Sequence, residues 1–310
     1  PGRSPAVDPS ERPAGATDVG NAGGRRERTR FAPAPTGHLH LGHVVSAIHV
    51  WGVARSRNAE VVLRIEDHDR SRCRPEYEDS IREDLDWLGF AADAEVPRQS
   101  ERGDQYAEVL DRLERQGLTY ACVCSRRDID ALIPAVPDVE QRYPGTCSGG
   151  NVDPATTMAL RVRMAAGIER FDDIALGPQK QSPADQCGDF FVRDRLGQWT
   201  YQFAVAVDDF HQGVNLVVRG WDILASTGRQ LRLARLIGRT YMPRFLHHPL
   251  VHKADGAKLS KSDGDSGVRE LRTAGHTPAE VIGMAAHTAG LTATARPIAA
   301  IDVGSLFAQR

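Results

Sequence analysis

The stretch RFAPAPTGHLHLGH, residues 30–43, decides the fold of this chain. An apolar start passes through Pro and Gly into a run from Val44 to Trp51 whose apolar residues have helical spacing. A strand that turns into a helix in this way presents a helix N-terminus, which suits a phosphate group. His40 and His43, three residues apart in the first turn, can both donate to phosphate oxygens. An ordinary strand–turn–helix with surface histidines would show the same spacing, so this stretch alone leaves both interpretations open.

A second stretch far downstream favours the phosphate interpretation. Residues 258–262 read KLSKS within the polar, glycine-containing setting ADGAKLSKSDGD. Its two lysines, Lys258 and Lys261, would form a cationic loop able to close over a triphosphate, although a solitary loop of this kind is usually only solvated. We call residues 30–43, with His40 and His43, the histidine turn, and residues 258–262 the lysine loop. Together and in this order, they resemble the two signatures of class I aminoacyl-tRNA synthetases. That resemblance implies a Rossmann-type parallel sheet and ATP, with Mg²⁺, as a cosubstrate.

The composition is that of an ordinary globular protein. The chain has 310 residues, of which 41% are hydrophobic and 26% charged, enough for one large or two modest domains. No apolar run approaches a membrane span, and the polar N-terminus lacks the apolar core of a secretion signal, so we expect a cytoplasmic protein that does not bind membranes. A net charge of −2 excludes a protein that coats nucleic acid, so any RNA contact must be local.

Strands alternate with helices along most of the chain, which predicts an α/β fold with a parallel sheet. The expected elements are a helix ending near Arg57, a strand at 60–65, helices at 81–88 and 105–116, strand–helix alternation over 199–209, 214–219 and 226–237, and a helix near 278–287. Ligands of such sheets bind at the carboxyl ends of the strands, where Glu66 and the histidine turn would lie.

We accordingly divide the chain into five segments. They are a disordered tail (1–28), the first half of a Rossmann catalytic domain (29–119), an insertion with a zinc knuckle (120–190), the second half of the catalytic domain with the lysine loop (191–262) and a short helical C-terminal region (263–310). The C-terminal region is too short for an anticodon-binding domain with a core of its own, so we expect none.

Four separated motifs narrow the family. The histidine turn, RIEDHD at 64–69, YQFAVAVDD at 201–209 and RGWDIL at 219–224 resemble glutamyl-tRNA synthetases over residues 29–262. Arg30 and Arg219 could read the carboxylates of glutamate, Tyr201 could add a directional hydroxyl, and Glu66 could pair with the α-ammonium group. Taken singly, each could instead be a surface ion pair or a core tyrosine.

The resemblance also assigns residues around the histidine turn. It implies that Ala32 and Ala34 lie at the glutamate, that ATP is bound by Pro35, Thr36, Gly37, His40, Gly42, His43 and Lys261, and that His40, His43, Lys258 and Lys261 are catalytic. The family usually has Ser at the position of Ala34, so a hydroxyl of the substrate pocket is missing here.

Three of the five cysteines lie close together in the predicted insertion. The spacing Cys122-x-Cys124 followed by Tyr143-x-x-x-Cys147 allows three thiolates to converge on one zinc ion, although small buried thiols without a metal are also common. From chemistry alone, water or histidine would be a better fourth ligand than Tyr143. The pattern nevertheless resembles the zinc site of glutamyl-Q tRNA(Asp) synthetases, in which the tyrosine is a ligand.

That family, a group of short paralogues of glutamyl-tRNA synthetase, also fits the short C-terminal region. The resemblance implies an enzyme that activates glutamate without tRNA and attaches it to the queuosine base at the wobble position of tRNA(Asp). Its partners would be glutamate and the anticodon loop of tRNA(Asp), and we expect a monomer. The alternatives are a truncated or split glutamyl-tRNA synthetase that charges tRNA(Glu), a non-catalytic paralogue that binds glutamate or tRNA, and a nucleotidyltransferase with another substrate.

Overall fold

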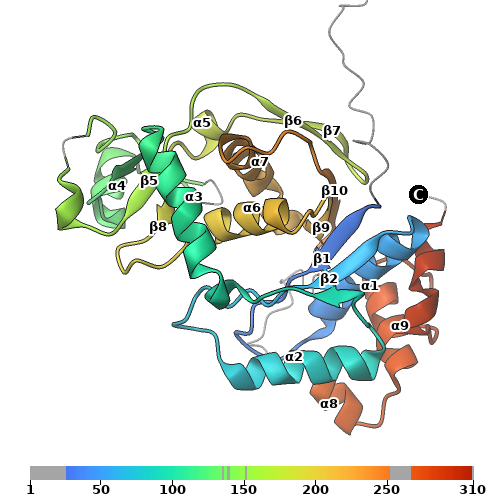
Figure 1. The fold of residues 1–310 in the computed structure, drawn as a ribbon. Coiled ribbons are helices and arrows are strands. Elements are labelled where there is room, and N and C mark those ends of the chain that lie inside the picture. The colour runs from blue at the N-terminus through green and yellow to red at the C-terminus, as the bar shows by residue number, and fades with distance from the viewer. Residues whose placement is uncertain (1–25, 135, 138–139, 151, 252–266, 309–310) are drawn as a thin grey trace, which may run out of the picture.

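The structure is a computed structural model that describes residues 26–134, 136–137, 140–150, 152–251 and 267–308 (Figure 1). The predicted lysine loop, with Lys258 and Lys261, lies outside the described residues, as does most of the predicted tail at 1–28. The remainder includes the histidine turn and the four predicted metal ligands.

Two sheets, built mainly of parallel strands, lie side by side at the centre of the fold (Figure 1). The first has the order β1 (Arg28–Phe31), β2 (Glu60–Leu63) and β3 (Ala94–Glu95), all parallel. The second contains the parallel strands β9 (Leu216–Gly220), β10 (Arg244–His248) and β6 (Glu169–Asp173), with β7 (Gly177–Gln181) antiparallel at its edge. The Asn215 N–H donates to the Arg28 carbonyl at 3.0 Å, which joins β1 to the start of β9. The predicted α/β fold with a parallel sheet is therefore confirmed.

Helix α1 (Leu41–Ser56) is the centre of the main hydrophobic core. Its residues from Val44 to Ala54 include ten that are buried, because the sheet covers one side while α9 (Pro278–Thr288) and the 3₁₀ helix η5 (Ala300–Phe307) cover the other (Figure 1). The predicted helix near 278–287 is confirmed as α9. The C-terminal region thus completes the core around the histidine turn.

Three predicted helices are present, two of them within two residues of the predicted bounds. Helix α2 (Pro75–Leu88) begins earlier than the predicted 81–88, because Pro75 starts it in the first turn, where proline is favoured. Helices α3 (Gly103–Arg115) and α7 (Thr227–Leu236) agree with the predictions at 105–116 and 226–237. The segment at 199–209, which the predicted strand–helix alternation includes without assigning its type, is helix α6 (Tyr201–His211), and Tyr201 is its first residue.

A third, antiparallel sheet stands apart from α1 and α9 in Figure 1. Its order is β4 (Thr119–Ala121), β5 (Leu160–Val162) and β8 (Phe190–Arg193), with the short helices α4 (Arg126–Leu132) and α5 (Pro183–Gln186) nearby. Strands β6 and β7 also belong to the segment predicted as an insertion, yet they extend the sheet of β9 and β10. Phe171 of β6 is buried against Phe245 of β10, and this apolar contact explains the attachment.

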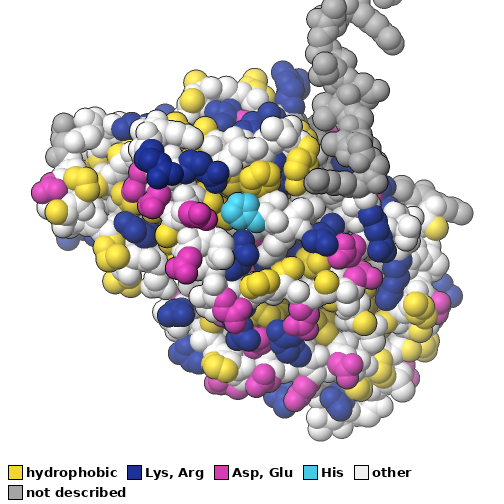
Figure 2. Space-filling view, viewed as in Figure 1, with side chains coloured by type: hydrophobic (Ala, Val, Ile, Leu, Met, Phe, Trp, Pro, Cys, Tyr) yellow, Lys and Arg dark blue, Asp and Glu magenta, His cyan; other side chains and the backbone are white. Residues whose placement is uncertain are grey.

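Basic and acidic side chains are interspersed over most of the face seen in Figure 2. This distribution agrees with the small net charge of −2. Among the helices of the described residues, none combines the length and the apolar character that a membrane span requires. The small net charge therefore identifies no binding surface by itself.

Candidate active site and metal centre

The histidine turn caps α1 with its own imidazole rings. The Gly42 N–H donates to His40 Nδ1 at 3.1 Å, and the His40 N–H donates to His43 Nδ1 at 3.1 Å. Because both Nδ1 atoms accept, the neutral rings carry their hydrogen on Nε2. The two ring centroids lie 3.9 Å apart, so two Nε2 donors stand together at the helix N-terminus. The imidazoles, and not the N–H of Gly42, are thus the groups that can donate to a phosphate.

Gly42 is required for this arrangement. A Cβ at this position would lie 2.9 Å from Cε1 of the His40 ring, which folds over the glycine. Since real Cβ atoms do not approach other carbons so closely, any side chain here would move the ring away from Gly42 and from His43. The glycine therefore determines where the predicted phosphate donors point.

The chain returns to the histidine turn directly after the predicted lysine loop. Gly267 forms an antiparallel bridge with His40, and the Val268 N–H donates to the Leu39 carbonyl at 3.0 Å. Helix α8 (Val268–Thr273) follows immediately. Lys258 and Lys261 lie outside the described residues, and Gly267, six residues after Lys261, lies beside the predicted phosphate site.

Arg30 and Arg64 share one buried carboxylate. Asp209 of α6 accepts from Arg30 Nε at 3.0 Å and from Arg64 Nη1 at 2.8 Å, and Arg64 Nη2 donates to Glu66 at 2.9 Å. Burial by itself would raise the pKa of Asp209, but the two guanidinium groups outweigh it and lower the pKa to about 2. Arg30 Nη1 donates to the Val218 carbonyl at 3.2 Å, so two of its three nitrogens are held by the protein and its orientation is set.

Arg219 of β9 is held differently, by neutral groups. Its Nε donates to His247 Nε2 at 3.0 Å, Nη1 to Gln230 at 2.6 Å and Nη2 to Thr227 at 2.8 Å. His247 Nδ1 lies 2.6 Å from Asp173, and burial lowers the pKa of His247, so this ring is neutral and carries its hydrogen toward Asp173. A buried guanidinium whose closest partners are neutral favours an anion as its counter-charge.

The phenol of Tyr201 interacts electrostatically with Glu66, Arg219 and Arg30. Burial raises the pKa of its phenol and the negative charge of Glu66 adds to this effect, whereas the positive charges of Arg219 and Arg30 oppose it. These four predicted residues therefore lie within electrostatic range of one another. Glu66 lies three residues beyond the end of β2, and Arg30 and Arg219 belong to β1 and β9, so they meet at the carboxyl edge of the sheet, where ligands of such folds bind.

The segment 32–37, between Arg30 and the two histidines, contacts the backbone at Glu66. The Glu66 N–H donates to the Pro33 carbonyl at 3.1 Å, and the Thr36 N–H donates to the Ala34 carbonyl at 2.8 Å. Ala32 is half-buried and Ala34 is exposed, while Pro35 is buried and both Thr36 and Gly37 are half-buried. Exposure of the methyl group of Ala34 leaves room at this position for the hydroxyl that the family usually has.

The four predicted metal ligands converge at the edge of the third sheet. The sulfur atoms of Cys122, Cys124 and Cys147 lie within 4.8 Å of one another, and Tyr143 Oη is 3.5 Å from Cys122 Sγ and 3.6 Å from Cys124 Sγ. Burial would raise the pKa of the Cys147 thiol, but hydrogen bonds from the Val123 N–H and from Tyr143 reverse this and lower it. Three thiols and a phenol gathered around one point form a donor set suited to a tetrahedral, thiophilic metal ion.

Tyr143 is held in place from outside the cluster. Its N–H donates to the Cys187 carbonyl at 2.9 Å, and the segment before it is tied to α7 by an ion pair between Glu140 and Arg229. Gly188 has a positive φ of 65°, and a Cβ there would lie 2.6 Å from the Tyr143 carbonyl oxygen. The glycine thus permits the close passage of the backbone that brings the phenol to the thiols.

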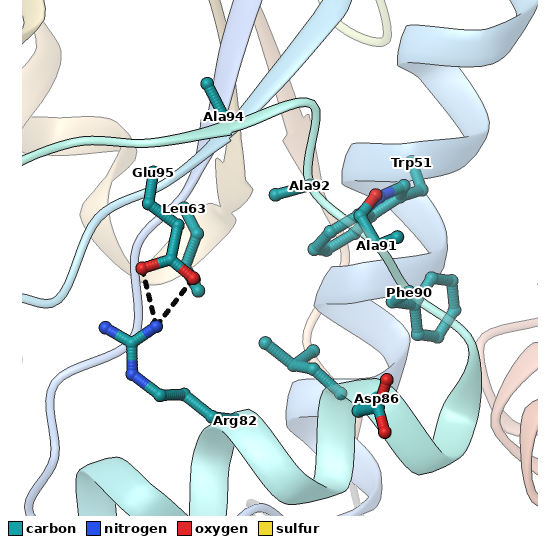
Figure 3. Close-up of a pocket in the computed structure, with 10 residues that line it drawn as sticks. Trp51, Leu63, Arg82, Asp86, Phe90, Ala91, Ala92, Ala94 and Glu95 are labelled. Atoms are coloured by element: carbon teal, nitrogen blue, oxygen red, sulfur yellow. Dashed lines mark hydrogen bonds and ion pairs between the residues drawn. The ribbon is translucent and has the colours of Figure 1, made fainter.

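A separate cavity of about 250 Å³ opens between α1, α2 and the segment before β3 (Figure 3). Trp51 and Ala92 line one side, while Arg82 and Glu95 form an ion pair across the other, at 2.6 Å. None of the residues that line it is a predicted site residue. Arg82 and Glu95 therefore neutralise each other here, and a third charged residue, Asp86, also lines the cavity.

Sequence reasoning missed the residues that hold the two arginines. Asp209 was visible as an acid that ends the apolar run of YQFAVAVDD, and a buried acid in such a run is a usable signal. His247 and Asp173 gave no such signal, because they are 74 residues apart and meet only through the pairing of β10 with β6.

Comparison with known proteins identifies the family of this chain. The family model for the catalytic domain of class I tRNA synthetases (E and Q) matches residues 27–295. A glutamyl-Q tRNA(Asp) synthetase from Nitratidesulfovibrio vulgaris is 40% identical over 283 residues, which cover 85% of this chain and 86% of the relative. Another, from Bordetella bronchiseptica, is 46% identical over 239 residues, covering 76% of this chain and 75% of the relative. The chain therefore belongs to the glutamyl-Q tRNA(Asp) synthetases, within the class I synthetase family.

Solved structures support the same class. A glutamate tRNA ligase from Elizabethkingia meningosepticum, crystallised with its amino acid, superposes with a TM-score of 0.70 at 28% identity. The match covers 84% of this chain but spans only 60% of the length of that ligase. A glutamate-tRNA synthetase from Elizabethkingia anophelis gives the same TM-score of 0.70.

Proposed function

We propose that this protein activates glutamate with ATP and transfers it to the queuosine base at the wobble position of tRNA(Asp). The observation that carries the proposal is the convergence of Arg30, Glu66, Tyr201 and Arg219 at the carboxyl edge of the sheet, from which the chain after β1 continues into the turn with the paired imidazoles of His40 and His43. Two cations, one anion and one hydroxyl complement an amino acid with two carboxylates and one ammonium group.

The residues have distinct parts in binding glutamate. Arg219, whose closest partners are neutral, would take the side-chain carboxylate as its counter-ion, with Tyr201 donating alongside it. Arg30 would add a second positive charge, oriented by Asp209. Glu66 would accept from the α-ammonium group while Arg64 keeps its carboxylate in position.

In the first reaction an α-carboxylate oxygen of glutamate attacks the α-phosphorus of ATP. The bond from that phosphorus to the bridging oxygen breaks, and pyrophosphate leaves with its electron pair. The Nε2 donors of His40 and His43 would hold the phosphate oxygens, and Lys258 and Lys261 would neutralise the charge that develops. Such chemistry depends on positioning and charge neutralisation and needs no protein nucleophile.

In the second reaction a hydroxyl of the queuosine cyclopentenediol attacks the carbonyl carbon of glutamyl-adenylate, and AMP leaves. The anticodon loop of tRNA(Asp) would then have to enter the site that the histidine turn and Arg219 border. Since one chain contributes every residue named here, we propose that the monomer is the active form.

We infer that the metal of the cysteine cluster is Zn²⁺, held in an inserted subdomain within residues 120–190. Cys122, Cys124, Cys147 and Tyr143 would be its ligands, because three thiolates and one oxygen suit zinc better than Mg²⁺ or Ca²⁺. Bound there, zinc would cross-link the end of β4 to the segment 143–147. No step of the reaction requires it.

The decisive experiment is transfer of labelled glutamate to purified tRNA(Asp) with and without queuosine, and to tRNA(Glu). We expect label only on tRNA(Asp) that contains queuosine. Label on tRNA(Glu) would instead make this a minimal glutamyl-tRNA synthetase, and label on neither would refute transfer to tRNA. Lys261→Ala should abolish glutamate-dependent pyrophosphate exchange and leave the circular dichroism spectrum unchanged. Undiminished exchange would remove the lysine from the mechanism.

A further inference from the structure

Arg161 lies beside the cysteine cluster, which consists of Cys122, Cys124, Cys147 and the adjoining Tyr143, and it contacts Cys122 and Tyr143. It is the middle residue of β5, and only 5% of its surface is exposed. Its Nε donates to Cys122 Sγ at 3.2 Å, and its Nη1 donates to the Asp189 carbonyl at 2.6 Å. The guanidinium carbon lies 3.6 Å from the centroid of the Tyr143 ring and 3.7 Å from that of Phe191. The cation is therefore enclosed between two aromatic faces with one edge against a sulfur atom.

No carboxylate forms an ion pair with Arg161 among the described residues, and the carboxylate of the neighbouring Asp189 instead accepts from Tyr120 Oη and from the Met164 N–H, each at 2.7 Å. The ion pairs found in the described part of the chain include none with Arg161, which in this respect resembles the buried Arg219 and differs from the buried Arg64 and Arg102, each of which is paired with an acid. Burying an unpaired guanidinium is unfavourable, and two aromatic faces offset only part of the loss of hydration. A negatively charged sulfur at Cys122 would supply the missing counter-charge.

A metal centre of the proposed composition supplies that charge. Three thiolates around a divalent cation leave at least one negative charge uncompensated, and a phenolate from Tyr143 would add another. Arg161 is positioned to neutralise this excess, because one contact reaches the sulfur of Cys122 and another reaches the ring of Tyr143. Groups next to a metal that orient its ligands typically change metal affinity by about 10- to 100-fold.

We propose that Arg161 is a positioning residue of the metal centre, which neutralises the thiolate of Cys122 and orients the ring of Tyr143 toward the metal. The inference rests on the metal site of the proposed function and adds a determinant of its affinity. It also gives a physical reason why a tyrosine can serve as the fourth donor: stacking on a fixed cation restricts the ring to the orientation in which its oxygen faces the thiols.

The test is a competition for Zn²⁺ between the protein and the chromogenic chelator 4-(2-pyridylazo)resorcinol at constant pH. The variants are Arg161→Gln, Tyr143→Phe and the double change. Arg163→Gln serves as the matched control, because Arg163 also stacks on a tyrosine, Tyr120, and donates to carbonyl groups but to no sulfur. We expect Arg161→Gln to weaken zinc binding by about 10- to 100-fold and the control to change it by less than about 3-fold.

The double variant separates this role from ordinary packing. If Arg161 acts partly through the phenol, its replacement should reduce affinity less in the Tyr143→Phe background than in the wild type. Equal zinc affinity of wild type and Arg161→Gln would overturn the inference, as would strictly additive losses. Where Arg161→Gln does not fold, Phe191→Leu, which removes one face of the stack, should still weaken binding, and unchanged affinity there would also refute it. Failure of the wild type to bind zinc would instead refute the metal site itself.

Discussion

Asp209→Asn should both destabilise the protein and weaken glutamate activation. The substitution keeps the shape of the side chain but removes the charge that Arg30 and Arg64 share. The lowering of the Asp209 pKa to about 2, from an ordinary value of about 4, corresponds to about 2 to 3 kcal/mol of stability. Breaking one side of a buried ion pair typically costs about 3 to 5 kcal/mol. Because Arg64 keeps Glu66 as a partner, we expect a loss near 3 kcal/mol, or about 5 °C in Tm for a chain of 310 residues.

Thermal unfolding of Asp209→Asn should be compared with that of Asp69→Asn. Asp69 also has a pKa of about 2, through hydrogen bonds with Ser71 and Arg72, but it lies at the surface. Water screens such a pair, so its loss should cost less than about 1 kcal/mol. An acid with a lowered folded-state pKa stabilises the fold above its unfolded pKa, and that stability is lost as pH falls toward the folded value. The Tm difference between wild type and Asp209→Asn should therefore be full at pH 7 and shrink as pH falls from about 4 toward 2.

Glutamate activation reports on the second consequence of the same change. With Asn at position 209, the partner of Arg30 Nε loses its charge, so pyrophosphate exchange should show kcat/KM for glutamate reduced at least about 10-fold, the equivalent of about 1.4 kcal/mol. The reasoning would be wrong if Asp209→Asn and Asp69→Asn lowered Tm equally, or if the Tm difference persisted unchanged at pH 3.

Three further substitutions test other parts of the site. Cys122→Ser should release bound zinc and lower Tm, whereas Cys73→Ser, a change outside the cysteine cluster, should keep the metal. Atomic emission measurements on the purified proteins report the zinc content, and equal zinc content in the two variants would contradict the ligand assignment. Ala34→Ser should lower KM for glutamate about 2- to 10-fold, because the added hydroxyl can make one hydrogen bond to the substrate. Tm should not change. An unaltered KM would place residue 34 outside the glutamate pocket. Gly42→Ala should reduce the rate of pyrophosphate exchange at least about 10-fold, because the added methyl group displaces the imidazole of His40. Gly103→Ala, where a Cβ meets no atom within 4 Å, should leave the rate unchanged. Similar rates in both variants would disprove the role of Gly42.

Much of the fold could be read from local patterns. Apolar spacing predicted α1, α3, α7 and α9, because each buries one face or more against the sheet and neighbouring helices. The pattern did not reveal that Tyr201 begins a helix, since an apolar run of this length is compatible with either a strand or a buried helix. It also did not reveal that β6 and β7 extend the sheet of β10, because strand pairing depends on contacts between segments far apart in the chain.

The sequence by itself determined which chemical groups this protein can use. Paired histidines, two arginines, a tyrosine and three cysteines at short fixed spacings are local features, and each motif contains the chemistry it predicts. Only the tertiary structure decided what holds those groups. Asp209 reaches Arg30 across 179 positions of the chain, and Arg161 reaches Cys122 across 39. Such partners carry no spacing signal, because a buried charge requires a counter-charge nearby in space, and only the packing of helices and strands determines which residue supplies it.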